Sequence, residues 1–124
     1  MERRNSPQLV VNQPVWIIGL DRQSESDEQL LGYAIDVSES GMLVEIQGDS
    51  VENRIKVFAS TINNRVIEIA GRIIAIGGSG PGYSRIRLKF EGNFRTRRTF
   101  YDDFMQAVRH KQRPVSHRTQ EDRA

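Results

Sequence analysis

Asp36, Ser38 and Gly41 form the group whose spacing is most informative about chemistry. Asp36 and Ser38 are two positions apart, so on an extended chain their side chains project from the same face. A carboxylate and a hydroxyl placed together can accept hydrogen bonds from the N–H groups on the edge of a guanine base. The alternative is local: Asp and Ser form turns through nearby backbone groups, and Gly41 allows a positive φ if the turn needs one.

The other candidate groups favour structural interpretations. The run Gly77–Gly82 has no Gly-Lys-Ser/Thr ending and lies between two expected strands, which indicates a hairpin turn and not a phosphate loop. His110 and His117 have no second ligand at metal spacing, and the chain has no cysteine. Asp102 and Asp103 are adjacent, so on a helix they point in different directions. We therefore predict no metal site, no cofactor and no enzymatic activity.

Charge gives a weak indication of the binding partner. The formal net charge of +2 is mild, whereas nucleic-acid-binding domains usually gather a stronger basic excess on one face. The strands also lack an obvious aromatic platform for stacking bases, so we expect no nucleic-acid binding. Arg95, Arg97 and Arg98 lie at the start of the expected helix, where the helix dipole disfavours cations. They form either a solvated face or a contact with an anion or a protein partner.

Length and hydropathy predict a single domain. The 124 residues, 37% of them hydrophobic, suffice for one modest core. The most apolar run, 15–20, is far shorter than the roughly 20 residues that a membrane-spanning helix needs. The N-terminal sequence is a poor signal peptide because Asn12, Gln13 and Pro14 interrupt its apolar part. We expect a cytoplasmic protein without membrane insertion.

β-Branched and aromatic residues favour a first strand at 9–20, and the pattern of apolar residues further along predicts five more, at 31–37, 42–46, 55–62, 66–76 and 83–90. A small antiparallel sheet removes its exposed edges by closing into a barrel. The second, fifth and last of these strands have clear apolar faces, which we expect to point inward: Leu31, Tyr33, Ile35 and Val37; Ile67, Ile69, Ile73 and Ala75; Ile86, Leu88 and Phe90.

The period changes after the last strand. Phe100, Phe104, Ala107 and Val108 are spaced i, i+4, i+7, i+8, which predicts one amphipathic helix from about residue 95 to about residue 111. The predicted fold is a mostly β, six-stranded antiparallel barrel with one C-terminal α-helix covering one end or side. We expect residues 1–8 to be a flexible basic arm, 9–111 the barrel with its helix, and 112–124 a disordered tail.

The chain resembles the PilZ domain family. Asp36, Ser38 and Gly41 match the Asp/Asn-x-Ser-x-x-Gly motif of that family. An Arg-Arg arm, a first strand containing Val10–Val15, a closing strand ending in Phe90 and a terminal helix follow in the family's order over most of the chain. The resemblance implies a six-stranded barrel that binds the bacterial second messenger cyclic diguanylate (c-di-GMP).

The family's second binding motif is Arg-x-x-x-Arg in the N-terminal arm. Arg4 matches its first arginine, with Arg3 just before it, but Gln8 stands where the second arginine would be. Glutamine hydrogen-bonds without charge, and losing one charged hydrogen bond costs on the order of 1.5–3 kcal/mol, or about one to two decades in affinity. The resemblance therefore implies a ligand site of Arg3, Arg4, Gln8, Asp36, Ser38 and Gly41, weakened at one position.

Two functional hypotheses follow. In the first, the chain is a c-di-GMP receptor whose arm orders on the ligand and thereby signals to a partner protein. In the second, it is an adaptor that has lost the nucleotide and acts only through protein contacts. The intact turn motif favours the first hypothesis, and Gln8 favours the second.

Overall fold

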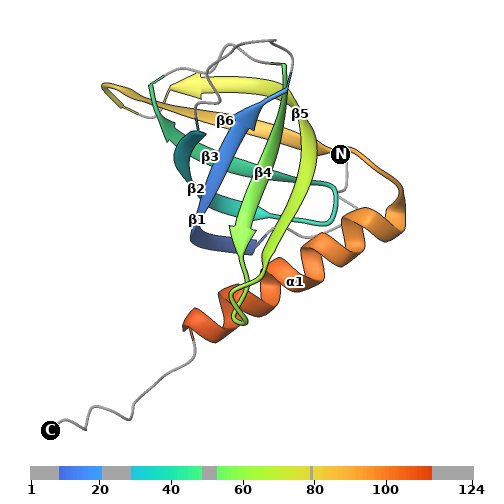
Figure 1. The fold of residues 1–124 in the computed structure, drawn as a ribbon. Helices are drawn as coiled ribbons and strands as arrows, with labels where there is room; N and C mark the ends of the chain where they lie inside the picture. The colour runs from blue at the N-terminus through green and yellow to red at the C-terminus, as the bar shows by residue number, and fades with distance from the viewer. Residues whose placement is uncertain (1–8, 21–28, 49–52, 79, 113–124) are drawn as a thin grey trace, which may run out of the picture.

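The structure is a computed structural model that describes residues 9–20, 29–48, 53–78 and 80–112. The expected arm at 1–8 and the tail from 113 onward lie outside these ranges. The described chain forms six strands followed by one helix (Figure 1): β1 Leu9–Gly19, β2 Gln29–Val37, β3 Gly41–Gln47, β4 Arg54–Ser60, β5 Val66–Gly78, β6 Tyr83–Phe90 and α1 Phe94–Gln112.

The strands form a closed antiparallel barrel in the order β1-β2-β3-β6-β5-β4. β1 closes it by pairing with both β2 and β4. β1 pairs with β4 only over its last part, from Trp16 to Gly19. The predicted fold class is confirmed, and the order of strands places β6 beside β3 although they are distant in sequence.

The core combines the inward side chains of the barrel with one face of α1. Ile86, Leu88 and Phe90 point inward, as the alternation in β6 predicts. α1 lies across one end of the barrel and packs against β4 and β5 (Figure 1). Phe104, which is 0% exposed, stacks on Phe100 at 5.7 Å between ring centroids, and Phe100 meets Phe90 edge-on at 5.5 Å. The predicted helical stripe is therefore the buried face.

Local hydrogen bonds fix the start of α1. Asn93 precedes the first helical residue, and its Oδ1 accepts a hydrogen bond from the backbone N–H of Thr96 at 2.8 Å. This is an N-cap, which satisfies one of the donors that every helix leaves free at its first turn. Gly92, with a φ of 102°, turns the chain from β6 into this cap. The helix begins at Phe94, close to the predicted start.

The predicted inward face of β2 is wrong in its first half. Leu31 and Tyr33 are 44% and 46% exposed, while Gly32 and Ala34 are buried. The interior has no room for larger side chains there: a Cβ on Gly32 would lie 2.9 Å from Val44 Cγ1.

A register shift then reverses the alternation of β2. The shift lies between Ala34 and Asp36, and it brings Val37 inside as predicted, while Ile35 is half-buried. A bulge of this kind places one extra residue in a strand and so changes which residues face the core.

The predicted face of β5 is wrong at one residue. Ile69 is buried, and Ile67 and Ile73 pack partly against the core, but Ala75 is exposed. The pairing with β6 shifts register between Ile73 and Ala75. Beyond the shift, residues Ile74–Gly78 are all exposed, so the end of β5 does not contribute to the core.

Candidate functional site

The turn between β2 and β3 is held by Ser38. Its backbone N–H donates to the carbonyl oxygen of Gly41 at 2.9 Å, which closes the turn. Its Oγ lies 3.3 Å from the backbone N–H of Ser40, which donates to it, and 3.2 Å from Ser40 Oγ. Ser38 is also buried. The hydroxyl of Ser38 therefore shapes the turn as well as lining the site described below.

Gly41 has a different structural role from the one its position in a turn suggests. It is not among the residues with positive φ. A Cβ at Gly41 would instead lie 2.1 Å from the carbonyl oxygen of Leu88 on β6. No side chain fits at this distance, so a glycine is required because β3 and β6 approach each other closely here.

Asp36 carries an unsatisfied carboxylate oxygen. It belongs to a row of register partners across three strands, Asp36 on β2, Leu43 on β3 and Arg87 on β6. Its Oδ1 is buried and has no hydrogen-bond partner among the described residues. The guanidinium of Arg87 is 3.9 Å away, which is an ion-pair distance beyond the reach of a hydrogen bond. Since buried polar atoms in proteins are rarely left unpaired, this oxygen is a candidate acceptor for a ligand's hydrogen-bond donor.

An open pocket of about 350 Å³ lies beside the turn. It joins two parts of the chain that are far apart in sequence, and its lining residues are Ser38, Ser40, Gly41, Ile74, Arg87, Leu88 and Lys89. Asp36 is linked to this pocket through its contact with Arg87. The structure thus brings together the three predicted residues of the turn, whereas Arg3, Arg4 and Gln8 lie outside the described residues.

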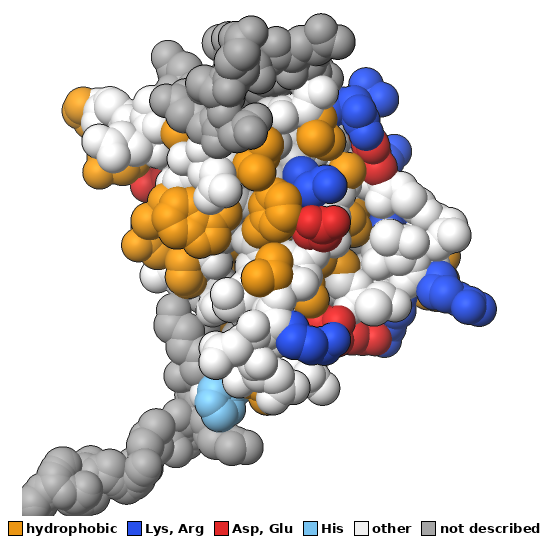
Figure 2. All heavy atoms as spheres, viewed as in Figure 1, with side chains coloured by type: hydrophobic (Ala, Val, Ile, Leu, Met, Phe, Trp, Pro, Cys, Tyr) orange, Lys and Arg blue, Asp and Glu red, His pale blue; other side chains and the backbone are white. Residues whose placement is uncertain are grey.

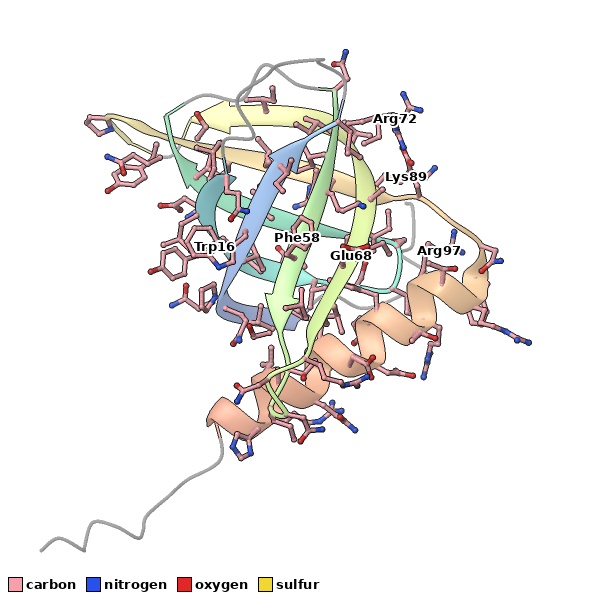
Figure 3. The ribbon with its side chains drawn as sticks, viewed as in Figure 1. Trp16, Phe58, Glu68, Arg72, Lys89 and Arg97 are labelled. Atoms are coloured by element: carbon pink, nitrogen blue, oxygen red, sulfur yellow. The ribbon has the colours of Figure 1, made fainter. Side chains whose placement is uncertain are left out.

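Basic side chains lie on the same side as the pocket. Lys89, which lines it, is the register partner of Arg72 on β5, and the two lie close together in Figure 3. Figure 2 shows hydrophobic side chains collected on one side, over β1 and β2, while Lys and Arg are spread over the rest of this face, many of them next to Asp or Glu. Two of the residues that line the pocket, Arg87 and Lys89, are basic, which suits an anionic ligand.

Sequence reasoning missed Arg87 and Lys89 as site residues. Alternation in the last strand correctly places both on the outside of the barrel. Alternation alone does not predict which residues lie next to Arg87 and Lys89. The pairing of β6 with β3 brings them close to the turn.

The turn is also tied to the helix. Glu39 forms an ion pair with Arg98 of α1, which also contacts Asp102 one helical turn later. These two carboxylates raise the pKa of Arg98, with Asp102 the larger influence. Arg97 donates to the carbonyl oxygen of Gly92 at 3.3 Å. Two of the three arginines at the helix start therefore make contacts within the protein.

The described residues contain no group of His, Cys, Asp or Glu able to hold a metal ion. The described part of α1 is not long and apolar enough to cross a membrane.

Comparisons with known proteins agree with this architecture. The model of the PilZ domain family matches residues 2–100. The PilZ domain of YcgR from Escherichia coli, solved with c-di-GMP, superposes with a TM-score of 0.65 at 13% identity, covering 95% of this chain and 100% of that one.

Two longer proteins share the fold. The inhibitor of motility MotI/DgrA of Bacillus subtilis gives a TM-score of 0.60 at 13% identity, and E. coli YcgR in complex with c-di-GMP gives 0.57 at 16%. The alignments cover 90% and 89% of this chain, but they span only 52% and 48% of those two proteins. No curated protein matches the chain in sequence. With the family model matching most of its length, the chain belongs to the PilZ domain family.

Proposed function

We propose that this protein is a receptor for c-di-GMP, which binds at the turn between β2 and β3 and in the adjoining pocket. The observation that carries the proposal is the buried Oδ1 of Asp36, which has no hydrogen-bond partner among the described residues and lies 3.9 Å from Nη1 of Arg87, a residue that lines the pocket. Membership of the PilZ family and the similar fold of YcgR, solved with that nucleotide, support it. The function is binding without catalysis.

Each part of the site has a chemical task. Asp36 accepts hydrogen bonds from the N1–H and N2–H groups of a guanine, since its Oδ1 has no hydrogen-bond partner among the described residues. Ser38 keeps the turn in shape and presents its hydroxyl to the pocket. Arg3 and Arg4 of the arm supply charge to the phosphates, and Gln8 supplies an uncharged hydrogen bond.

Signalling follows from the arm. Binding draws residues 1–8 onto the barrel, and the ordered arm changes the surface that a partner protein meets. A receptor of this kind works in the cytoplasm. The alternative, an adaptor that acts only through protein contacts, is favoured by Gln8, whose uncharged side chain weakens the arm's part of the site.

A calorimetric titration of the full chain with c-di-GMP tests the proposal. We expect saturable binding that weakens with salt, because charged arm residues contact phosphate. Arg4→Ala should weaken binding and flatten its salt dependence, since one cation fewer meets the ligand. Absence of binding at low salt and millimolar ligand would contradict the receptor and leave the adaptor.

A further inference from the structure

Arg87 connects the two halves of the site. It lines the pocket beside the turn, and its Nη1 lies 3.9 Å from Oδ1 of Asp36, which has no hydrogen-bond partner among the described residues. That separation is too long for a hydrogen bond, so the guanidinium and this oxygen are adjacent but do not satisfy each other. Asp36 therefore offers a hydrogen-bond acceptor next to the N–H donors of the Arg87 guanidinium.

Guanine presents the complementary order of groups. Its N1–H and N2–H donors adjoin the O6 acceptor, and N7 follows as a second acceptor. Arginine donates to O6 and N7 together in the commonest specific contact between proteins and guanine. Adenine presents an amino donor in place of O6 and has no N1–H, so it would set donor against donor at Arg87 and acceptor against acceptor at Asp36.

We propose that Arg87 selects guanine, donating to O6 and N7 of the base whose N1–H and N2–H are held by Asp36. This inference rests on the proposed function and adds a specificity residue to it. Arg87 stands on β6, which is paired on both sides, with β3 and with β5. Its position is therefore fixed by the barrel and does not depend on the arm. It supplies a charged, bidentate contact of the kind that Gln8 does not provide.

Lys89 offers a matched control on the same strand. It lines the same pocket two residues further on and carries the same charge. Its ammonium is a point charge without a planar fork, which suits a phosphate but does not read two acceptors of a base together. Loss of Lys89 should therefore weaken binding without altering the choice of base.

The test uses c-di-GMP and its 7-deaza analogue, in which a C–H replaces N7 of each guanine. The wild-type chain should bind the natural nucleotide about 10- to 100-fold more tightly, because the analogue lacks one acceptor for a charged donor. Arg87→Gln should bind c-di-GMP more weakly and bring this preference close to one. Lys89→Gln should weaken binding of both nucleotides by the same factor, keep the preference and lower the salt dependence.

Arg87→Lys separates a loss of base selection from a folding defect. It keeps the positive charge beside Asp36 and removes only the planar guanidinium with its two parallel donors. It should retain the wild-type melting temperature and lose the preference. A wild-type chain that binds both nucleotides equally, or variants at Arg87 that keep the full preference, would overturn this inference and leave the receptor intact. A wild-type chain that binds neither nucleotide would overturn the receptor itself.

Discussion

The end of the barrel covered by α1 and the turn between β2 and β3 differ in how completely their side chains are packed and hydrogen-bonded. Under the helix, Phe104 is fully buried and stacks on Phe100. At the turn, Oδ1 of Asp36 is buried without a hydrogen-bond partner among the described residues, and the neighbouring Arg87 lines an open pocket together with Lys89. At the end of the barrel covered by α1, the side chains contact one another and so stabilise the fold. At the turn, one carboxylate oxygen of Asp36 has no hydrogen-bond partner among the described residues, and buried polar atoms without partners are characteristic of binding sites.

The two regions are nevertheless connected. Arg98 of α1 reaches Glu39 of the turn, and the bidentate pair of Arg54 and Glu91 joins β4 to the segment just before α1. The helix therefore supports the site from outside as well as closing the core. Substitutions at the end of the barrel covered by α1 should change the stability of the fold, and substitutions at the turn should change ligand binding.

The largest effect is expected for Phe104→Ala. The side chain is completely buried, so its removal leaves a cavity and should lower the free energy of unfolding by about 3–5 kcal/mol in denaturant titrations. Phe94→Ala is the control on the same helix, because Phe94 is 60% exposed and should change stability little. A loss well under 1 kcal/mol at Phe104 would show that the helix does not dock as described.

On the binding side, Gln8→Arg should tighten c-di-GMP binding by about one to two decades, by restoring a charged hydrogen bond. The gain should shrink as salt rises, since part of it is Coulombic. Gln8→Lys adds charge without a planar fork and should gain less. If calorimetry shows no gain at low salt, the arm does not lie where the family motif implies.

Gly41→Ala should disturb both the fold and the pocket. The new Cβ would meet the carbonyl oxygen of Leu88, so β3 and β6 must separate, with an expected loss of about 1–3 kcal/mol in the free energy of unfolding. Gly77→Ala is the control, because a Cβ there has no atom within 4 Å and the backbone needs no positive φ. Equal stability of the two variants in thermal unfolding would contradict the close approach.

The smallest effect concerns acid stability. Two hydrogen bonds from Arg54, at 2.8 and 2.9 Å, lower the pKa of Glu91, although partial burial opposes them. The folded state thus holds this carboxylate charged more firmly than the unfolded state. The stabilisation is present above the ordinary glutamate pKa of about 4.3 and is lost as pH falls through the lowered value.

Glu91→Gln should therefore lower the free energy of unfolding by about 0.2–1 kcal/mol at neutral pH, because both partners are partly exposed. The difference from the wild type should shrink as pH falls through the lowered pKa of Glu91. Glu68→Gln, which breaks a more exposed pair with Lys56 at 3.6 Å, should do less. Parallel curves of stability against pH for Glu91→Gln and the wild type would refute this assignment.

The sequence predicted the barrel and its helix because periodicity is a local property. The spacing of Phe100, Phe104 and Val108 alone marks the buried face of α1. Periodicity failed in β2, where two alternating faces were available and the space beside Val44 decided between them. A bulge between Ala34 and Asp36 then reversed the alternation within β2, and the local sequence does not predict where such an extra residue is placed.

The site was predictable only in part for the same reason. Asp36, Ser38 and Gly41 are adjacent in sequence, so their spacing is informative. Arg87 joins them through the pairing of β3 with β6, which is a property of the strand order. The role of Gly41 likewise depends on the distance to Leu88 and not on its own backbone angles.

The most direct test of the account is a single variant, Asp36→Ala, measured for both affinity and melting temperature. The account predicts c-di-GMP binding about 5- to 150-fold weaker, the range for one good bidentate base contact. It also predicts a nearly unchanged melting temperature, because this oxygen makes no hydrogen bond among the described residues and its ion pair with Arg87 is long, at 3.9 Å. Unchanged affinity with a lower melting temperature would show that Asp36 only stabilises the turn, and would contradict the account.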